Sequence, residues 1–268
     1  MTNPIKWLEN KINEQPIEKR LMTRLITYSI LIIPLVYLWV TTDYQNILFS
    51  ISLILLIGAL FFNREDVTSE LQETKDEIIN KMAELVEFKD EDTGYHVRRV
   101  SEYTRLLATL DGRLSYKQIN NLAEASPLHD IGKIAIKDKI LTKPEKLTDE
   151  ERKIMDTHTT KGYKIFKDSK KDYLKLAAKI AYEHHEKWDG TGYPRGIKGE
   201  DISLEGRITA IADVFDALVH KRCYKDAMEL NKAIKIIKEG RGSHFDPNLV
   251  DLFLENKNQF IAIKEKYQ

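Results

Sequence analysis

Two histidines that stand next to each other, His184 and His185, begin the part of the sequence with the clearest chemical character. A glycine-containing loop follows them and runs through Gly192, Tyr193 and Pro194. Because adjacent side chains on a helix diverge by roughly 100°, two neighbouring imidazoles are poorly placed to bind a single ion. They are well placed to bind one ion each when two ions lie side by side. The run therefore predicts a site for more than one metal ion, beside a shaped pocket wall.

The other residues with metal-ligand chemistry lie in the same part of the chain. All seven histidines follow residue 95, and His129 is directly followed by Asp130. Asp213 falls in a mostly apolar helical pattern, where a carboxylate is costly unless it is paired or bound to a metal ion. Taken singly, His96 and His158 have ordinary structural explanations, such as a satisfied core histidine. Five such histidines, together with the aspartates, favour a metal site.

Composition restricts this chemistry to histidine and carboxylate ligands. The single cysteine, Cys223, excludes an internal disulfide and a cysteine-based metal cage. The 42 basic residues balance the 42 acidic residues, so no net positive field attracts nucleic acid, and we expect no DNA partner.

The elements that must position these residues are predicted to be helices. Thr148 and Glu151 match a capping box, and an apolar pattern with helical spacing follows it as far as Phe166. Further helical patterns cover residues 172–185 and begin again near Ser203. We find no convincing run of alternating strand residues, no glycine-rich phosphate loop and no internal repeat. The fold class is therefore predicted to be all-α, with one helical domain over residues 89–268.

The N-terminal part of the chain has a different, strongly apolar pattern. Residues 25–42 and 47–62 form two apolar runs that are joined by a short polar connection without a basic residue. Each run is close to the length of about 20 residues that a spanning helix needs. Lysines and arginines in the preceding segment, residues 1–24, place both ends of such a hairpin in the cytoplasm. We therefore predict a transmembrane hairpin over residues 25–62 and a multi-pass location in the cell membrane, with the N-terminus and the helical domain in the cytoplasm. The alternative is a buried helical hairpin of a soluble protein.

A charged helical segment, residues 63–88, connects the two parts. Apolar residues recur in it at spacings near three and four, as in a short coiled coil: Val67, Leu71, Ile78, Met82 and Leu85. This pattern suggests a homodimer through the linker helix. It is equally typical of the first amphipathic helix of the domain that follows.

The strings His129-Asp130-Ile131-Gly132-Lys133 and His184 to Pro194 together resemble the HD-GYP branch of the HD-domain phosphohydrolases. The resemblance is collinear from about residue 87 to residue 253. It implies an all-α HD-domain helical bundle over residues 89–268. It also implies a phosphodiesterase that hydrolyses cyclic di-GMP to the linear dinucleotide pGpG and further to GMP.

The resemblance also implies two or three divalent metal ions, iron or manganese, with zinc as a third option. Asp130 would bridge two ions, and His96 would bind a third ion together with Asp92, which stands where the family usually has Glu. Sites with two and with three ions therefore both remain open. The ligands of the first two ions, by motif position, would be His129, Asp130, His158, His184, His185 and Asp213.

Two cations about 3.5–4 Å apart can share a hydroxide and hold both oxygens of an in-line displacement at phosphorus. In this scheme Asp130 and Lys133 are catalytic residues, because Lys133 is placed to neutralise charge on the phosphoryl oxygens. The family pattern suggests that a third catalytic residue, Asp216, orients this lysine. The alternative for Lys133 is a surface residue at a helix end.

Two further stretches resemble the substrate contacts of the family. Gly192 and Tyr193 match the loop that borders the guanine nucleotide. Arg222 and Lys225 match cations that meet the phosphates and bases, although Cys223 replaces the usual proline and both charges could simply be solvated. Asp90 is a further candidate for a nucleotide contact. His220 and His244 fit no ligand position and are interpreted as structural.

Three functions compete on this basis. The first is a membrane-anchored cyclic di-GMP phosphodiesterase. The second is an HD-type hydrolase of another nucleotide, such as the mixed cyclic dinucleotide 3',3'-cGAMP or a nucleotide monoester. The third is a receptor that binds a cyclic dinucleotide without hydrolysing it.

Overall fold

The computed structural model describes residues 45–89, 95–220 and 227–267, together with the single residues 33, 37 and 40. Every regular element in these ranges is a helix, apart from one isolated bridge between Arg241 and Phe245. The all-α fold class predicted from the sequence is therefore confirmed for the part of the chain that is described.

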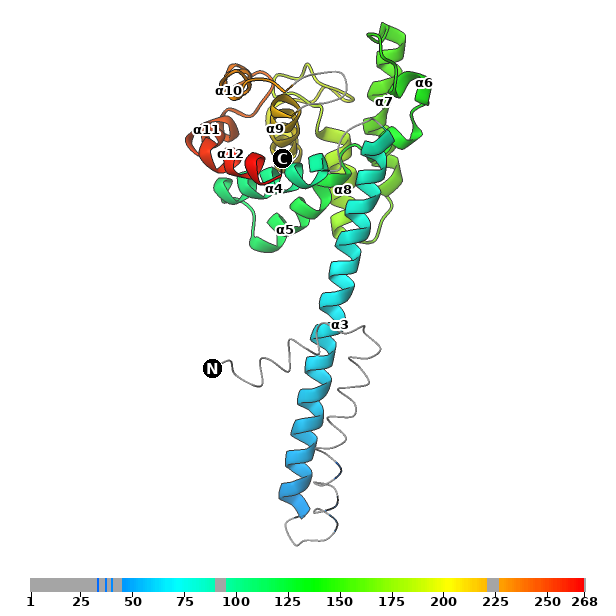
Figure 1. Cartoon of the computed structure of the whole chain (residues 1–268), viewed down its shortest axis with the longest axis vertical. Helices are drawn as coiled ribbons and strands as arrows, with labels where there is room; N and C mark the ends of the chain where they lie inside the picture. The colour runs from blue at the N-terminus through cyan, green and yellow to red at the C-terminus, as the bar shows by residue number, and fades with distance from the viewer. Residues whose placement is uncertain are drawn as a thin grey trace. The chain divides into compact units, whose positions relative to one another are not determined.

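The chain divides into two compact units, residues 1–75 and 76–268. A long helix, α3 (Gln45–Lys89), begins in the first unit and ends in the second (Figure 1). The predicted second membrane span, residues 47–62, lies within α3. The predicted first span lies almost entirely outside the described residues, as does the segment 1–24.

Within the described ranges, no helix combines the length and the apolar character that crossing a membrane would require. This finding does not support the predicted membrane span at residues 47–62.

The linker segment 63–88 also lies in α3. In the second unit, Ile79, Ala83 and Val86 on this helix are buried in the hydrophobic core. Ile78 and Leu85 remain exposed. The end of α3 thus packs as an amphipathic helix of the domain, and dimerisation through its exposed residues stays a prediction.

The rest of the second unit is a bundle of short helices. In chain order these are α4 (Tyr95–Asp111), α5 (Tyr116–Ala125), η1 (Ser126–Leu128), η2 (Ile131–Ala135), α6 (Asp138–Leu141), α7 (Asp149–Phe166), α8 (Asp172–Glu183), η3 (Gly199–Asp201), α9 (Leu204–Val219), α10 (Leu230–Glu239), α11 (Pro247–Glu255) and α12 (Lys257–Lys266).

An aromatic cluster joins the helices from both ends of this unit. Tyr103 of α4 lies edge-on to Phe215 of α9, with ring centroids 5.2 Å apart. Phe253 of α11 packs between Phe215 and Phe260 of α12, at 5.0 and 4.7 Å. Because all four rings are almost completely buried, they fix α4 against α9, the two helices that carry one side of the candidate site.

Helix starts follow the signals in the sequence. The predicted capping box of α7 is present, since the Thr148 hydroxyl accepts from the Glu151 N–H and the Glu151 carboxylate accepts from the Thr148 N–H. Ser203 caps α9 in a similar way through the N–H of Gly206. These caps satisfy backbone donors that a helix start would leave without partners.

A close approach of η2 to α7 has a specific cause in the sequence. A Cβ atom at Gly132 would collide with the backbone carbonyl of His158 and would lie 2.5 Å from the backbone N of Gly162. A Cβ atom at Gly162 would lie 2.9 Å from the Cβ of Ala181 on α8. Only residues without a side chain allow these backbones to meet, and their contact sets Asp130 beside His158.

Candidate metal centre

The predicted ligands that the structure describes come together from five parts of the bundle. His96 is on α4, and His129 and Asp130 lie between η1 and η2. His158 is on α7, Asp213 is on α9, and the paired histidines directly follow α8. Four of these side chains are almost fully buried: His96, His129, His158 and His184.

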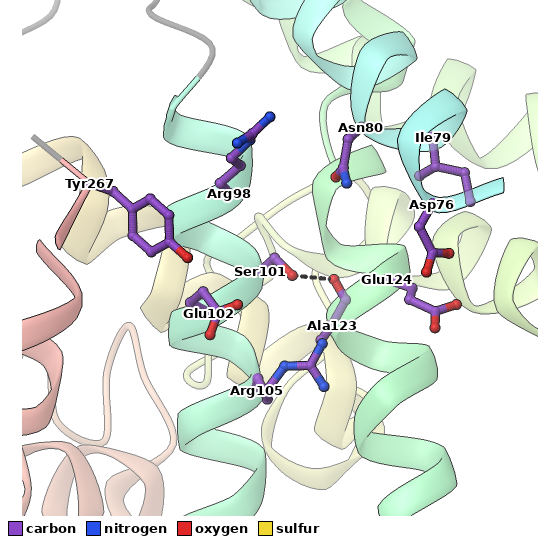
Figure 2. Close-up of a pocket in the computed structure, with 10 residues that line it drawn as sticks. All are labelled: Asp76, Ile79, Asn80, Arg98, Ser101, Glu102, Arg105, Ala123, Glu124 and Tyr267. Carbon is purple, nitrogen blue, oxygen red and sulfur yellow. Dashed lines mark hydrogen bonds between the residues drawn. The ribbon is translucent and has the colours of Figure 1, made fainter. Parts of the chain in front are cut away.

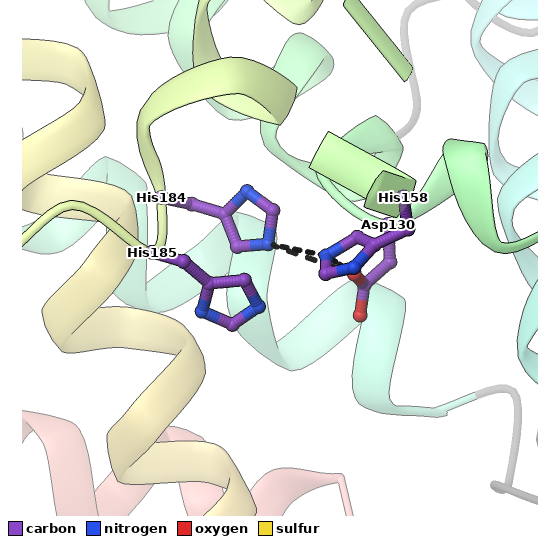
Figure 3. A group of neighbouring side chains, drawn as sticks. All are labelled: Asp130, His158, His184 and His185. Atoms are coloured by element: carbon purple, nitrogen blue, oxygen red, sulfur yellow. Dashed lines mark hydrogen bonds and ion pairs between the residues drawn. The ribbon is translucent and has the colours of Figure 1, made fainter. Parts of the chain in front are cut away.

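The first group contains Asp130, His158, His184 and His185, whose ligand atoms all lie within 4.8 Å of one another (Figure 3). The Oδ1 atom of Asp130 is 3.2 Å from His158 Nε2 and 3.6 Å from His184 Nε2. The Nε2 atoms of His158 and His184 are 3.4 Å apart. Several nitrogen and oxygen lone pairs thus converge on one small volume, which is the arrangement of a metal site.

The second group contains His96, His129 and Asp213, which also meet within 4.8 Å. Asp213 Oδ1 is 3.7 Å from Nε2 of both histidines. Asp130 connects the two groups, because its Oδ2 atom is 3.3 Å from His129 Nε2 while its Oδ1 atom faces the first group. A carboxylate in this position can place one oxygen on each of two ions.

Hydrogen bonds orient the imidazoles for metal binding. Nδ1 of His129 is 2.9 Å from the Ser126 carbonyl oxygen, and Nδ1 of His158 is 2.9 Å from the Met155 carbonyl oxygen. His184 Nδ1 lies 3.1 Å from the carbonyl oxygen of Ile180. A carbonyl can only accept, so each Nδ1 carries a proton, and the Nε2 lone pair of each imidazole, in its neutral form, is directed toward the cluster.

His96 is oriented by a carboxylate instead. Its Nδ1 atom is 2.7 Å from Asp216 Oδ2, while its Nε2 atom faces Asp213. Asp213 and Asp216 are one helical turn apart on α9, so both face α4. This is the carboxylate–histidine arrangement that commonly supports metal ligands in proteins.

Nε2 of His129 and Oδ1 of Asp130 are buried atoms of the cluster that lack hydrogen-bond partners among the described residues. Both atoms are inaccessible to water, and Nε2 of His158 lies 3.2 Å from Oδ1 of Asp130. Leaving such atoms unpaired costs of the order of 1–3 kcal/mol each. A bound cation would satisfy both, so the residues present fit a metal centre.

The charges of the cluster favour the metal-binding forms of Asp130, His184 and His185. Burial lowers the pKa of His129, but the carboxylates of Asp130 and Asp213 outweigh it and raise this pKa to about 9, so a metal ion would displace a proton from His129. Burial opposes ionisation of Asp130, but the Lys133 ammonium and His129 hold the pKa of Asp130 well below its ordinary value. Burial lowers the pKa of His184, and it lowers the pKa of His185 strongly, with the neighbouring histidines adding to the effect. Both imidazoles are therefore neutral at pH 7 and able to donate a lone pair.

The structure gives Lys133 and Asp216 different partners from those predicted. The Nζ atom of Lys133 lies 2.9 Å from Asp130 Oδ2. The carboxylate of Asp216 is instead held by His96, by the guanidinium of Arg99 at 2.6 and 3.0 Å, and by His220 at 3.1 Å. The prediction that Asp216 orients Lys133 therefore needs correction, because Asp216 faces α4 and positions His96.

The predicted nucleotide loop lies against the first group. The ring centroid of Tyr193 is 4.8 Å from that of His185 and 6.4 Å from that of His158. The N–H of Tyr193 donates to the carbonyl of His185. A Cβ atom at Gly192 would lie 2.5 Å from that same carbonyl oxygen, so the fold of the loop requires glycine there.

Four predicted site residues lie outside the described residues. They are Asp90 and Asp92, before α4, and Arg222 and Lys225, after α9. Their predicted roles in metal and substrate binding stay predictions.

Residues that the motif analysis did not single out support the site. Arg99 is 2% exposed and holds Asp216 with two nitrogens. Its position three residues after His96, on the same helical face, is the one sequence signal that could have indicated it. Glu183 and Glu186 bind Arg195 beside the predicted nucleotide loop.

A separate surface depression of about 300 Å³ lies where α3, α4 and α5 meet (Figure 2). Arg98, Ser101 and Arg105 of α4 line it, and the Ser101 hydroxyl donates to the Ala123 carbonyl at 2.6 Å. The depression shares no lining residue with the two His/Asp groups.

Comparison with known proteins places this geometry in a family. The sequence model of the HD domain family matches residues 80–249, which include every described member of the two His/Asp groups. The chain belongs to the HD domain family. The His/Asp groups, the family membership and the helical fold together define an HD-domain fold with a candidate metal centre.

Relatives of known activity extend the comparison. The 3'3'-cGAMP-specific phosphodiesterase 2 of Vibrio cholerae is 45% identical over 205 residues, which are 76% of this chain and 39% of the relative. The cyclic di-GMP phosphodiesterase of Thermotoga maritima is 41% identical, over 74% of this chain and 54% of the relative. The cyclic di-GMP phosphodiesterase response regulator RpfG of Xanthomonas campestris is 41% identical, over 73% and 51%. The chain thus spans about half the length of the curated relatives that it matches.

One solved structure shares the fold. The structure of a cyclic GMP-AMP-specific phosphodiesterase of V. cholerae superposes with a TM-score of 0.50 at 21% identity, covering 69% of this chain and 50% of the other. At this identity the likeness concerns the fold alone.

Proposed function

We propose that this chain is a metal-dependent phosphodiesterase that hydrolyses cyclic di-GMP to linear pGpG, and further to GMP. The observation that carries the proposal is the pair of buried His/Asp groups that share Asp130. The relatives named as cyclic di-GMP phosphodiesterases and the loop with Gly192 and Tyr193 support the substrate class.

The residues that would hold the metal ions are those of the two groups. One ion would be bound by the group of His158, His184 and His185, and another by the group of His129 and Asp213, with Asp130 between them. Iron or manganese suits these nitrogen and oxygen ligands, and zinc is a further option. When bound, the ions supply an activated water nucleophile and positive charge at the scissile phosphate.

The chain's own residues then have defined tasks. The ammonium of Lys133 lies beside Asp130, and only 12% of the Lys133 side chain is exposed. In this partly dry site it would neutralise the charge on a phosphoryl oxygen. Tyr193, packed on His185, would form the wall against which a nucleotide rests. Within the second group, His96 would hold a third ion together with Asp92 if the site binds three ions, which the proposal does not require.

A second substrate is favoured by a specific observation. The V. cholerae relative at 45% identity is named for 3'3'-cGAMP, which differs from cyclic di-GMP in one base. Both dinucleotides present the same phosphodiester to the metal centre, so the bases alone would decide between them. The location in the cell membrane stays a prediction, whichever dinucleotide is the substrate.

A competition assay tests this proposal. Anaerobically prepared protein, loaded with Mn²⁺ or Fe²⁺, is given cyclic di-GMP and 3',3'-cGAMP in equal amounts, and the products are separated by chromatography. We expect linear dinucleotide from cyclic di-GMP at a higher kcat/KM than from 3',3'-cGAMP. Faster hydrolysis of 3',3'-cGAMP would favour the second substrate.

The matched control in this assay is Asp130→Ala, which we expect to abolish turnover of both dinucleotides. Binding of a dinucleotide without turnover by the metal-loaded protein would contradict the enzyme and favour a receptor.

A further inference from the structure

The loop that carries Tyr193 is tied back to the end of α8 by one arginine. Arg195 follows Tyr193 by two residues, and its guanidinium Nη2 donates to Glu183 Oε1 at 2.5 Å. The backbone N–H of Arg195 donates to Glu186 Oε1 at 2.8 Å. Arg195 is therefore bound through its side chain to the residue before His184 and through its main chain to the residue after His185.

Aromatic contacts add a third attachment. The guanidinium carbon of Arg195 lies 4.7 Å from the centre of the Tyr182 ring on α8. The Tyr182 ring is in turn stacked on Tyr163 of α7, with centroids 4.6 Å apart. The planar guanidinium can stack on the ring and bind a carboxylate at the same time, which a lysine ammonium cannot do.

Both glutamates that bind Arg195 are buried. Glu183 is 7% exposed, and its second oxygen accepts from the N–H of Ser203, the residue that caps α9. Glu186 is 2% exposed, and its Oε2 atom has no hydrogen-bond partner among the described residues. A buried carboxylate with one unpaired oxygen is costly, and neither glutamate belongs to the His/Asp groups. Their contacts serve the loop and the start of α9.

We propose that Arg195 is a positioning residue: clamped by Glu183 and Glu186 and stacked on Tyr182, it fixes the ring of Tyr193 against His185 at the nucleotide side of the site. The proposal rests on the proposed function for its substrate readout. Arg195 itself is about one third exposed in its side chain and touches no member of the His/Asp groups in its hydrogen bonds or ion pairs. It acts on the substrate through the loop.

Loss of the clamp has a distinct expected signature. The imidazoles of His158 and His184 are oriented by carbonyls of their own helices and not by Arg195. The proposal makes the position of the Tyr193 ring depend on the guanidinium of Arg195, whereas the backbone hydrogen bonds of Tyr193 and Arg195 do not involve it. Substrate binding should therefore weaken while the metal content and the chemical step are kept.

The test compares Arg195→Ala, Arg195→Lys and Glu183→Gln with wild type. The control is Arg241→Ala, which removes an arginine from an exposed ion pair with Asp251. Each protein is measured for bound metal per chain, for kcat and KM with cyclic di-GMP, and for hydrogen exchange of the backbone amides of residues 190–195.

We expect Arg195→Ala to raise KM at least tenfold, with kcat and bound metal within threefold of wild type and with faster amide exchange in the loop. Arg195→Lys and Glu183→Gln should show smaller changes of the same kind, and Arg241→Ala should show none. Unchanged KM and unchanged exchange in Arg195→Ala would overturn the clamp. An equal fall of kcat and bound metal would also overturn it, because the metal ligands would then depend on the arginine.

If the wild-type protein hydrolyses no cyclic dinucleotide, the proposed function fails, but the exchange measurement still decides on the clamp. Faster exchange in Arg195→Ala than in Arg241→Ala supports it, and equal exchange overturns it.

Discussion

At the scale of single residues, the site is organised by carboxylates that each serve more than one imidazole. Asp130 faces His129 with one oxygen and His158 with the other. Asp213 faces the Nε2 atom of His96, and Asp216 faces its Nδ1 atom. Each carboxylate thus fixes the direction of a lone pair and supplies negative charge, and both effects favour a cation in the centre.

Asp216 offers the sharpest residue-scale prediction, because Arg99 depends on it. Replacing Asp216 with Ala leaves the guanidinium of Arg99, which is 2% exposed, without its carboxylate partner. Breaking a buried ion pair in this way costs about 3–5 kcal/mol. Urea unfolding of metal-free protein should show this loss in the free energy of unfolding.

The control for this measurement is Asp251→Ala, which loses a solvent-exposed pair with Arg241 and should change the unfolding midpoint little. Equal effects of the two substitutions would contradict the structural role of Asp216.

At the scale of elements, glycines decide how closely the ligand-bearing segments approach. η2 packs on α7 through Gly132 and Gly162. This contact brings Asp130 from one segment to His158 of the other, at 3.2 Å. The glycine in the His129 to Lys133 string is therefore needed for packing, in addition to any role in the motif.

Gly132→Ala is predicted to disturb both stability and metal binding. Its Cβ would meet backbone atoms of His158 and Gly162, which cannot move as a flexible side chain can. Overpacking of this kind costs about 1–3 kcal/mol, and more where the backbone must shift. Thermal unfolding and bound metal per chain should both fall.

Gly58→Ala on α3 is the matched control, since a Cβ there meets nothing within 4 Å and alanine favours a helix. A Gly132→Ala protein with wild-type metal content would contradict the link between this packing and the site.

Much of the local structure was predictable because its causes are local. The capping box of α7 spans Thr148 to Glu151, and the periodic pattern of α8 indicates its buried face. The grouping of the histidines followed from residue type and from the resemblance. What could not be predicted depends on contacts distant in sequence: Arg99 and Asp216 are separated by 117 positions. The prediction that Asp216 orients Lys133 is therefore wrong, because the bundle packing that turns α9 toward α4 is not visible in either helix alone.

At the scale of the whole molecule, stability should depend on pH through a histidine outside the metal centre. His244 stacks on Phe245, with ring centroids 4.1 Å apart. Burial first, and then the charge of Lys187, lowers the pKa of His244 from 6.5 to about 4. The unfolded state therefore binds more protons than the folded state between these values.

The contribution of His244 to the free energy of unfolding should therefore be fully present above pH 6.5 and should be lost as the pH falls toward 4. This loss should amount to about 1–3 kcal/mol. Denaturant unfolding at a series of pH values, in wild type and in His244→Gln, measures it. We expect a shallower fall in the variant, whereas identical slopes would contradict the assignment.

The central claim is that the two His/Asp groups joined by Asp130 form a metal centre that hydrolyses a cyclic dinucleotide. Its most direct test is a titration of metal-free protein with Mn²⁺ under anaerobic conditions, in which bound ions per chain and linear dinucleotide formed from cyclic di-GMP are measured on the same samples. The account predicts turnover that appears only as the number of bound ions reaches two per chain, and an Asp130→Ala protein that binds fewer ions and forms no product. Full turnover without bound metal, or no turnover with two ions bound, would contradict it.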